Sequence, residues 1–195
     1  MVLLTGFEPF TTGRGLSLSH NPTADIALAV GSETAGVTGA VLPVSYAKTP
    51  VTLAGLFEAH HPRIWVGLGY APHRETLDIE QIAVNVAHAN RGDNDGACPQ
   101  SEAVVEGGPV AYETALDIPA AVACFKGHGV VAQPAFHAGT FMCNQVFYLG
   151  CHRRAQGALD LAAFIHVPPM DDFGPFSRGL AAVLTDLMEA QRGPA

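Results

Sequence analysis

Short apolar runs alternate along the chain with longer segments in which apolar residues recur every three or four positions. The first pattern predicts buried strands, and the second predicts helices with one face against a core. We expect strands at residues 2–5, 37–44, 63–68, 77–86, 130–133 and 161–167. We expect a helix that opens at Asn21-Pro22, because Asn caps helices well and Pro suits the first helical position. Further helices are expected at residues 50–60, 118–125, 141–154 and 176–191.

Strands that alternate with helices predict a parallel sheet with helices on both of its faces. The 195 residues are enough for one sizeable core. We therefore expect a single α/β domain over residues 1–195, built on an open, twisted and mainly parallel sheet. Two irregular stretches, 11–20 and 90–109, interrupt the alternation. Long loops in a compact domain often carry function.

The composition narrows the choice of partners. Apolar residues make up 48% of the chain, charged residues 14%, and the formal net charge is −8. An acidic surface does not attract nucleic acid or an anionic membrane, so we expect neither as a partner. The first seven residues lack the basic segment and long apolar run of a signal peptide. The sequence therefore favours a soluble cytoplasmic protein.

Four cysteines show no paired spacing, so free thiols are expected. Cys143 stands out because a Gly139 turn runs directly into the helical pattern that contains it. At a helix start, unpaired N–H groups and the helix dipole lower a thiol's pKa and can hold an oxyanion. The alternative is a buried structural cysteine that packs as a small hydrophobic residue.

Two further residues fit the same chemistry. Glu80 shares a strand face with Ile82, Val84 and Val86, which predicts a core-facing carboxylate that needs a partner. His166 lies near the end of a buried strand, where open α/β sheets bind ligands, and can act as a base. The alternatives are a solvent-facing glutamate and a core histidine. The other histidines lack the helical spacing of a zinc site, so no metal is expected.

Cys143, His166 and Glu80 are together the parts of a cysteine–histidine–acid triad. In such a triad the imidazole deprotonates the thiol, and the acid fixes the imidazole tautomer. Residue types alone identify this site weakly, because most chains of this length contain such a trio. The segments around the three residues carry more information.

Those segments, in order along nearly the whole chain, resemble the pyroglutamyl-peptidase I family, the pyrrolidone-carboxylate peptidases. The matching segments are Gly6-Phe7-Glu8-Pro9-Phe10 with Asn21-Pro22-Thr23, Leu42-Pro43-Val44, Arg74 through Glu80 with Ile82-Ala83 and Asn85, Glu106-Gly107-Gly108-Pro109 with Tyr112 and Thr114, Ala138-Gly139-Thr140 through Cys143-Asn144 with Phe147-Tyr148, and Phe164-Ile165-His166-Val167-Pro168.

The resemblance implies a cysteine exopeptidase that removes N-terminal pyroglutamate from small peptides. It implies Glu80, Cys143 and His166 as catalytic residues, no cofactor, a cytoplasmic location and a homotetramer. It also places Phe10, Asn21, Phe141 and Met142 around the pyroglutamate ring. A neutral lactam needs apolar walls and a few hydrogen bonds rather than a salt bridge, which suits these residue types.

The chain departs from the family pattern near the expected substrate pocket. Tyr70 stands where the family has an amide side chain, and Pro72-His73 stand where it has glycines. The loop after Phe10 is longer than usual, with Gly13-Arg14-Gly15 in it. We expect Tyr70 to stack on the pyroglutamate ring together with Phe10. Two alternatives stay open: a cysteine amidohydrolase of the same fold with a shifted substrate, and a non-catalytic binding module.

Overall fold

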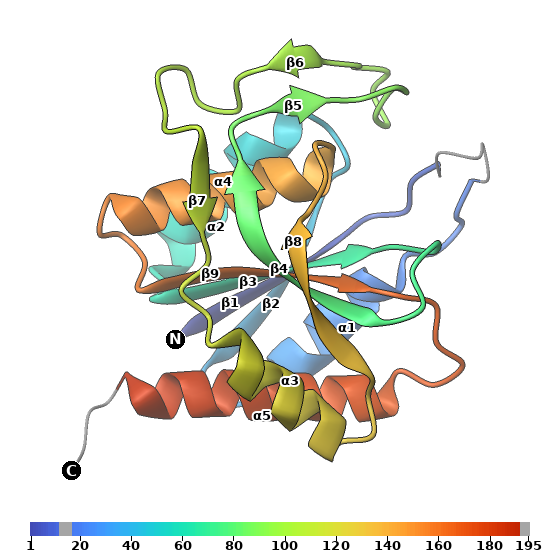
Figure 1. Ribbon diagram of the computed structural model, residues 1–195, viewed down its shortest axis with the longest axis vertical. Helices are drawn as coiled ribbons and strands as arrows, with labels where there is room; N and C mark the ends of the chain where they lie inside the picture. Colours follow the sequence, from blue (N-terminus) through green and yellow to red (C-terminus); the bar gives the residue numbers. More distant parts are fainter. Residues whose placement is uncertain (12–16, 192–195) are drawn as a thin grey trace.

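The computed structural model describes residues 1–11 and 17–191, so the glycine-containing loop at 13–15 lies outside the described residues. Four parallel strands form one half of the sheet, in the order β2-β1-β3-β9 (Figure 1). They are β1 (Val2–Phe7), β2 (Val37–Leu42), β3 (Ile64–Tyr70) and β9 (Leu161–Val167). Strands β1, β3 and β9 are almost entirely buried, as their apolar runs predict.

In the other half of the sheet, β4 (Leu77–Val84) and β8 (Ala132–His137) run in the opposite direction. Strand β4 pairs antiparallel with β9, through Asp78 and Ile79. It also pairs in parallel with β8 and antiparallel with the short β7 (Ala111–Glu113). A separate hairpin-like pair joins β5 (Ala87–His88) to β6 (Gln100–Glu102). The sheet is therefore mixed, with a parallel block of four strands at its centre and one edge.

Helices cover both faces (Figure 1). The cluster on one face includes apolar residues of α1 (Pro22–Glu33), α3 (Ile118–Gly127) and α5 (Gly174–Ala190). The cluster on the other face includes those of α2 (Lys48–His60) and α4 (Met142–Ala155). The expected α/β architecture, an open sheet with helices on both sides, is confirmed. Among the helices of residues 1–11 and 17–191, none has both the length and the apolar character needed to cross a membrane.

Several expected boundaries were wrong by a few residues, and two of them shape the site. Strand β4 ends at Val84 rather than at residue 86, and the chain then turns into β5. Strand β8 begins at Ala132 and continues to His137, four residues beyond the expected end. Its extra length follows from its pairing with β4, a long-range contact that local sequence patterns do not show.

Candidate active site

The carboxyl ends of β1, β3 and β9 lie side by side at one end of the sheet, and α4 begins beside them. Because β4 is antiparallel to β9, its first residues lie at the same end. A cavity of about 990 Å³ opens there, and we call it the main cavity. Cys143, His166 and Arg74 line it together with the five expected pocket residues, which are Phe10, Asn21, Tyr70, Phe141 and Met142. Ligand sites at strand ends are the rule in open α/β sheets.

Glu80 and His166 form a buried pair between two neighbouring strands. Glu80 is fully buried and His166 is 6% exposed. The Nδ1 atom of His166 lies 2.7 Å from Oε1 of Glu80. A carboxylate at this distance accepts the Nδ1 proton, which leaves Nε2 of a neutral ring without a proton. The imidazole is therefore oriented as a base whose free nitrogen is Nε2.

Arg74 adds a charge to the same pair. Its guanidinium donates to Oε1 of Glu80 at 2.8 Å and to Oδ2 of Asp78 at 2.5 Å. Asp78 in turn accepts from Thr76 and Gln133. These hydrogen bonds and the Arg74 charge lower the pKa of Asp78, although burial opposes them. Burial of an unpaired carboxylate is costly. The cationic side chain of Arg74 offsets part of that cost for Asp78 and Glu80.

The expected burial of Glu80 is confirmed, but the reason given for it was wrong. Ile82, Val84 and Val86 are only half-buried, and Val86 lies outside β4. Glu80 is buried because the first half of β4 lies inside the sheet, between β9 and β8. At that point both faces of the strand are covered, so strand parity does not decide which side chains are buried.

Cys143 occupies the first turn of α4, as the sequence predicts. Gly139 precedes it with φ of 78°, a conformation that favours glycine. The neighbouring Asn144 is fully buried and fixes the helix start to the chain after β4. Its amide accepts from the N–H of Val84 and donates to the carbonyls of Val84 and Val86 at 2.8–2.9 Å. The thiol therefore sits on a helix end that is anchored to the catalytic strand.

The thiol lies next to the strand that pairs with β9. Gly69 of β3 is the register partner of His166. A Cβ atom at Gly69 would lie 2.8 Å from Sγ of Cys143 and 2.9 Å from the Phe164 ring, closer than real Cβ contacts. Only glycine therefore leaves room for the thiol beside this strand. Cys143 and His166 thus converge on Gly69 from a helix and from a neighbouring strand.

The expected lowering of the Cys143 pKa is wrong. Burial, with a smaller contribution from the Glu80 carboxylate, raises the pKa of the thiol to about 12. Arg74, a backbone N–H and Arg91 act in the opposite direction without offsetting burial. Desolvation disfavours the thiolate more than the helix end favours it. In the free protein at neutral pH, Cys143 is therefore a neutral thiol that needs a base to become a nucleophile.

His166 is suited to that task. Burial lowers its pKa below the ordinary value of 6.5, and Arg74 contributes in the same direction, although Glu80 opposes both. The ring is therefore neutral at neutral pH and free to take a proton. Within the described residues, no side chain caps α4, whereas Asn21 and Asp117 cap α1 and α3. The first N–H groups of α4 are thus available to a negatively charged oxygen.

The walls of the main cavity are largely aromatic. Phe10 and Phe141 both face the guanidinium of Arg91, at 5.6 Å and 4.8 Å from their ring centroids. Met142 is 2% exposed. Asn21 also lines the cavity, but its amide caps α1 by accepting from Thr23 and donates to the carbonyl of Glu8. Its main hydrogen bonds are therefore structural.

Tyr70 lines the main cavity, as expected, and also lines a second pocket beside it. Arg74 and Arg91 are not among the site residues that the sequence predicts. Arg74 lies within the glutamate segment, six residues before Glu80, and that spacing is its only signal. Arg91 lies in the irregular stretch 90–109, and nothing in its surrounding sequence indicates that it reaches Phe10.

Comparison with known proteins identifies the family of this chain. The pyroglutamyl peptidase family model matches residues 1–174. The chain is 37% identical over 175 residues to the pyrrolidone-carboxylate peptidase of Thermococcus litoralis, covering 88% of this chain and 77% of that protein. It is 38% identical over 168 residues to that of Pseudomonas fluorescens, covering 86% and 78%.

A solved structure of a pyrrolidone carboxyl peptidase variant from Pyrococcus furiosus superposes with a TM-score of 0.89 at 32% identity, covering 97% of this chain and 98% of that one. Nearly the whole fold therefore has a counterpart of known structure. On both sequence and structure, this chain belongs to the pyroglutamyl peptidase family.

Proposed function

We propose that this protein is a cysteine exopeptidase that hydrolyses the amide bond after an N-terminal pyroglutamyl residue. The observation that carries the proposal is that Cys143 and His166 line one cavity and that Glu80 is hydrogen-bonded to His166, in a chain of the pyroglutamyl peptidase family. The relatives named above are pyrrolidone-carboxylate peptidases. The reaction class and the residues support each other.

In the first half of the reaction, Nε2 of His166 takes the proton from Cys143 as Sγ attacks the pyroglutamyl carbonyl carbon. The Glu80 carboxylate holds the tautomer and stabilises the imidazolium that forms. The carbonyl oxygen becomes an oxyanion near the first N–H groups of α4, which no side chain caps. The raised thiol pKa means that proton transfer accompanies attack rather than preceding it.

The imidazolium then gives its proton to the leaving amine, and the C–N bond breaks to leave a thioester on Cys143. A water molecule attacks this thioester, with His166 again as the base. The C–S bond breaks, pyroglutamate leaves as the free acid, and the thiol recovers its proton. Arg74 holds the Glu80 carboxylate in place throughout, through its hydrogen bond to the same oxygen that His166 contacts.

The main cavity suits a small neutral ring. Phe10, Phe141 and Met142 supply apolar walls, and Arg91 spans the two phenylalanine rings. The amide of Asn21 is largely committed to its cap, so we assign recognition of the lactam to backbone N–H and C=O groups near Phe10 and Tyr70. A site that hydrogen-bonds the lactam disfavours proline, because the same groups would then stay unpaired.

A panel of amides tests this proposal. Pyroglutamyl-, prolyl- and glutamyl-amides of one reporter amine are compared at matched concentrations, with the wild-type protein and with Cys143→Ala. We expect turnover of the pyroglutamyl amide by the wild type alone. Preference for another acyl group would favour an amidohydrolase with a shifted substrate, and no turnover of any amide would favour a binding module.

We also propose that residues 1–195 act as one catalytic domain, in the cytoplasm, and as a homotetramer. The family resemblance supports all three, and the four free cysteines fit a reducing compartment. A surface for self-association is available at β8, an edge strand among the described residues. Val131 and Phe136 beside and within it are 71% and 78% exposed. Light scattering of the wild type and of Phe136→Lys tests this surface, since a lower mass is expected for the variant.

A further inference from the structure

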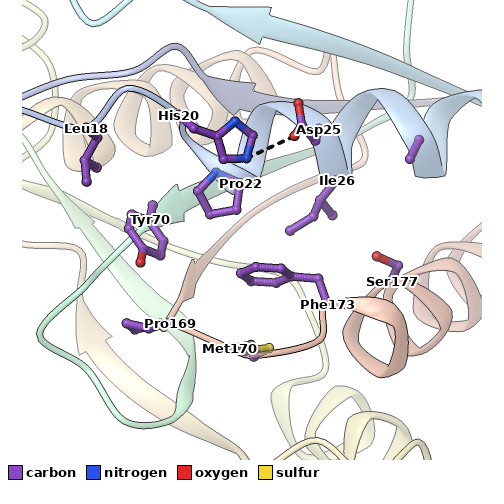
Figure 2. Close-up of a pocket in the computed structure, with 11 residues that line it drawn as sticks. Leu18, His20, Pro22, Asp25, Ile26, Tyr70, Pro169, Met170, Phe173 and Ser177 are labelled. Atoms are coloured by element: carbon purple, nitrogen blue, oxygen red, sulfur yellow. Dashed lines mark ion pairs between the residues drawn. The ribbon is translucent and has the colours of Figure 1, made fainter.

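A second pocket of about 390 Å³ lies beside the main cavity (Figure 2). Its walls come from α1, from the end of β3 and from the chain that links β9 to α5. Most of its lining is apolar, and His20 and Asp25 form an exposed ion pair of 3.1 Å on the α1 side. The lining residues are Leu18, His20, Pro22, Asp25, Ile26, Ala29, Tyr70, Pro169, Met170, Phe173 and Ser177.

Tyr70 and Leu18 line both spaces, so the second pocket adjoins the main cavity. Side chains alternate along a strand, and Gly69 faces the Cys143 thiol. Tyr70 therefore points toward the opposite face of the sheet, where Figure 2 shows it beside Pro22 and Phe173. The pocket therefore lies at the end of β3, on the face of the sheet that α1 and α5 cover, and the nucleophile lies on the other face.

The position of His166 indicates which part of the substrate lies near the second pocket. In the proposed reaction, the pyroglutamyl ring lies on the side of the main cavity that Phe10, Phe141 and Met142 line. The leaving amine must reach His166, which protonates it. Only three residues after His166, the chain enters the wall of the second pocket at Pro169 and Met170. The part of the peptide beyond the scissile bond therefore leaves toward this pocket.

We propose that the second pocket binds the side chain of the residue that follows pyroglutamate, and that it favours a large apolar side chain. The assignment rests on the proposed peptidase function, because it takes its direction from the scissile bond. Pro22 and Ile26 of α1, and Met170 and Phe173 of the chain between β9 and α5, provide apolar surface, and burial of an apolar side chain there is favourable. Tyr70 forms the wall between the ring and this side chain.

The experiment measures kcat/KM for pyroglutamyl-alanine amide and pyroglutamyl-phenylalanine amide, and expresses the result as their ratio. Ala29→Phe places a ring in the pocket from an exposed position of α1. Leu28→Phe is the matched control, since Leu28 is the adjacent exposed residue and does not line the pocket. Ser177→Phe fills the pocket from α5, so the test does not depend on one variant.

We expect the wild type to prefer the phenylalanine substrate, and both pocket-filling variants to lower that preference about tenfold, as loss of an apolar contact does in other hydrolytic sites. The control should keep the wild-type ratio. A ratio that is the same in the wild type, Ala29→Phe and Ser177→Phe would overturn the subsite. Failure of the wild type to cleave either amide would instead count against the peptidase function itself.

Discussion

The proposed catalytic pair and the walls of the two pockets are held in different ways. Glu80 and His166 lie on adjacent central strands, almost without exposure, and are joined to each other and to Arg74 by short polar contacts. Tyr70 and Phe141 lie at the ends of elements, and Arg91 lies in a long loop, all three only partly buried. The chemistry is thus fixed by the sheet, whereas the recognition of substrate depends on segments that can change without disturbing it. Substitutions should therefore act mainly on turnover in the first region and mainly on substrate preference in the second.

The largest effect is expected at Cys143. Cys143→Ala removes the nucleophile, and Cys143→Ser replaces it with a hydroxyl of far higher pKa beside a weak base. Both should lower kcat by at least about a thousandfold, as loss of a nucleophile does in comparable triads. Steady-state assays on a pyroglutamyl amide measure the effect, and thermal unfolding checks the fold. A Cys143→Ser variant with full activity would refute the mechanism.

The next largest effects are expected at His166 and Glu80. His166→Ala removes the base and should lower kcat nearly as much as loss of the thiol. Glu80→Gln keeps an oxygen that can accept from Nδ1 but loses the charge, so a smaller loss is expected, on the order of a hundredfold. The same assay compares the three variants. If Glu80→Gln were as inactive as His166→Ala, the carboxylate would do more than orient the ring.

Substitution of Arg74 should shift the pH dependence of turnover as well as its rate. Activity is lost at low pH when His166 becomes protonated, and the lowered pKa of His166 places this loss below pH 6.5. The Arg74 cation lowers that pKa, while Glu80 and Asp78 raise it. Arg74→Met should therefore move the acid limb of kcat/KM toward higher pH.

Two controls separate this effect from a general loss of structure. Arg74→Lys keeps the charge and should keep the acid limb near its wild-type position. Arg63→Met removes an arginine that pairs with Asp160 at an exposed site. Arg63 lies just before β3, at the opposite end of that strand from the active site, so this variant should leave the pH profile unchanged. An acid limb that stays in place in Arg74→Met would show that Arg74 only supports the fold.

The smallest effects are expected at Tyr70, in the recognition region. Tyr70→Phe keeps the ring that forms the wall and should change kcat/KM by no more than about twofold. Tyr70→Ala removes the wall between the two pockets. It should raise KM by about tenfold and lower kcat by less than that. Unchanged KM in Tyr70→Ala would place the side chain outside the bound substrate.

The local features of the site could be read from the sequence. A glycine turn before an apolar, helix-like run is a short-range signal, and it located Cys143 at a helix start. The buried run at 161–167 placed His166 at a strand end in the same way. Both conclusions depend only on residues within one or two turns of chain.

The features that the sequence did not predict depend on contacts between distant segments. Strand β4 reverses direction and lies between β9 and β8, which buries Glu80 for a reason that its own strand parity does not contain. The same burial raises the pKa of Cys143 against the local effect of the helix end. Arg74 reaches the site from the loop between β3 and β4, and the second pocket is formed by the ends of separate elements. Desolvation and strand order are properties of the whole fold.

The most direct test of the central claim is to trap the reaction while it proceeds. The protein is mixed with an excess of a pyroglutamyl ester, quenched with acid after a few milliseconds, and digested for mass spectrometry. The account predicts a pyroglutamyl thioester on the peptide that contains Cys143, present in the wild type and in Glu80→Gln but not in Cys143→Ala. Product formation in which the adduct is found on another residue, or in which Cys143→Ala turns over at the wild-type rate, would contradict it.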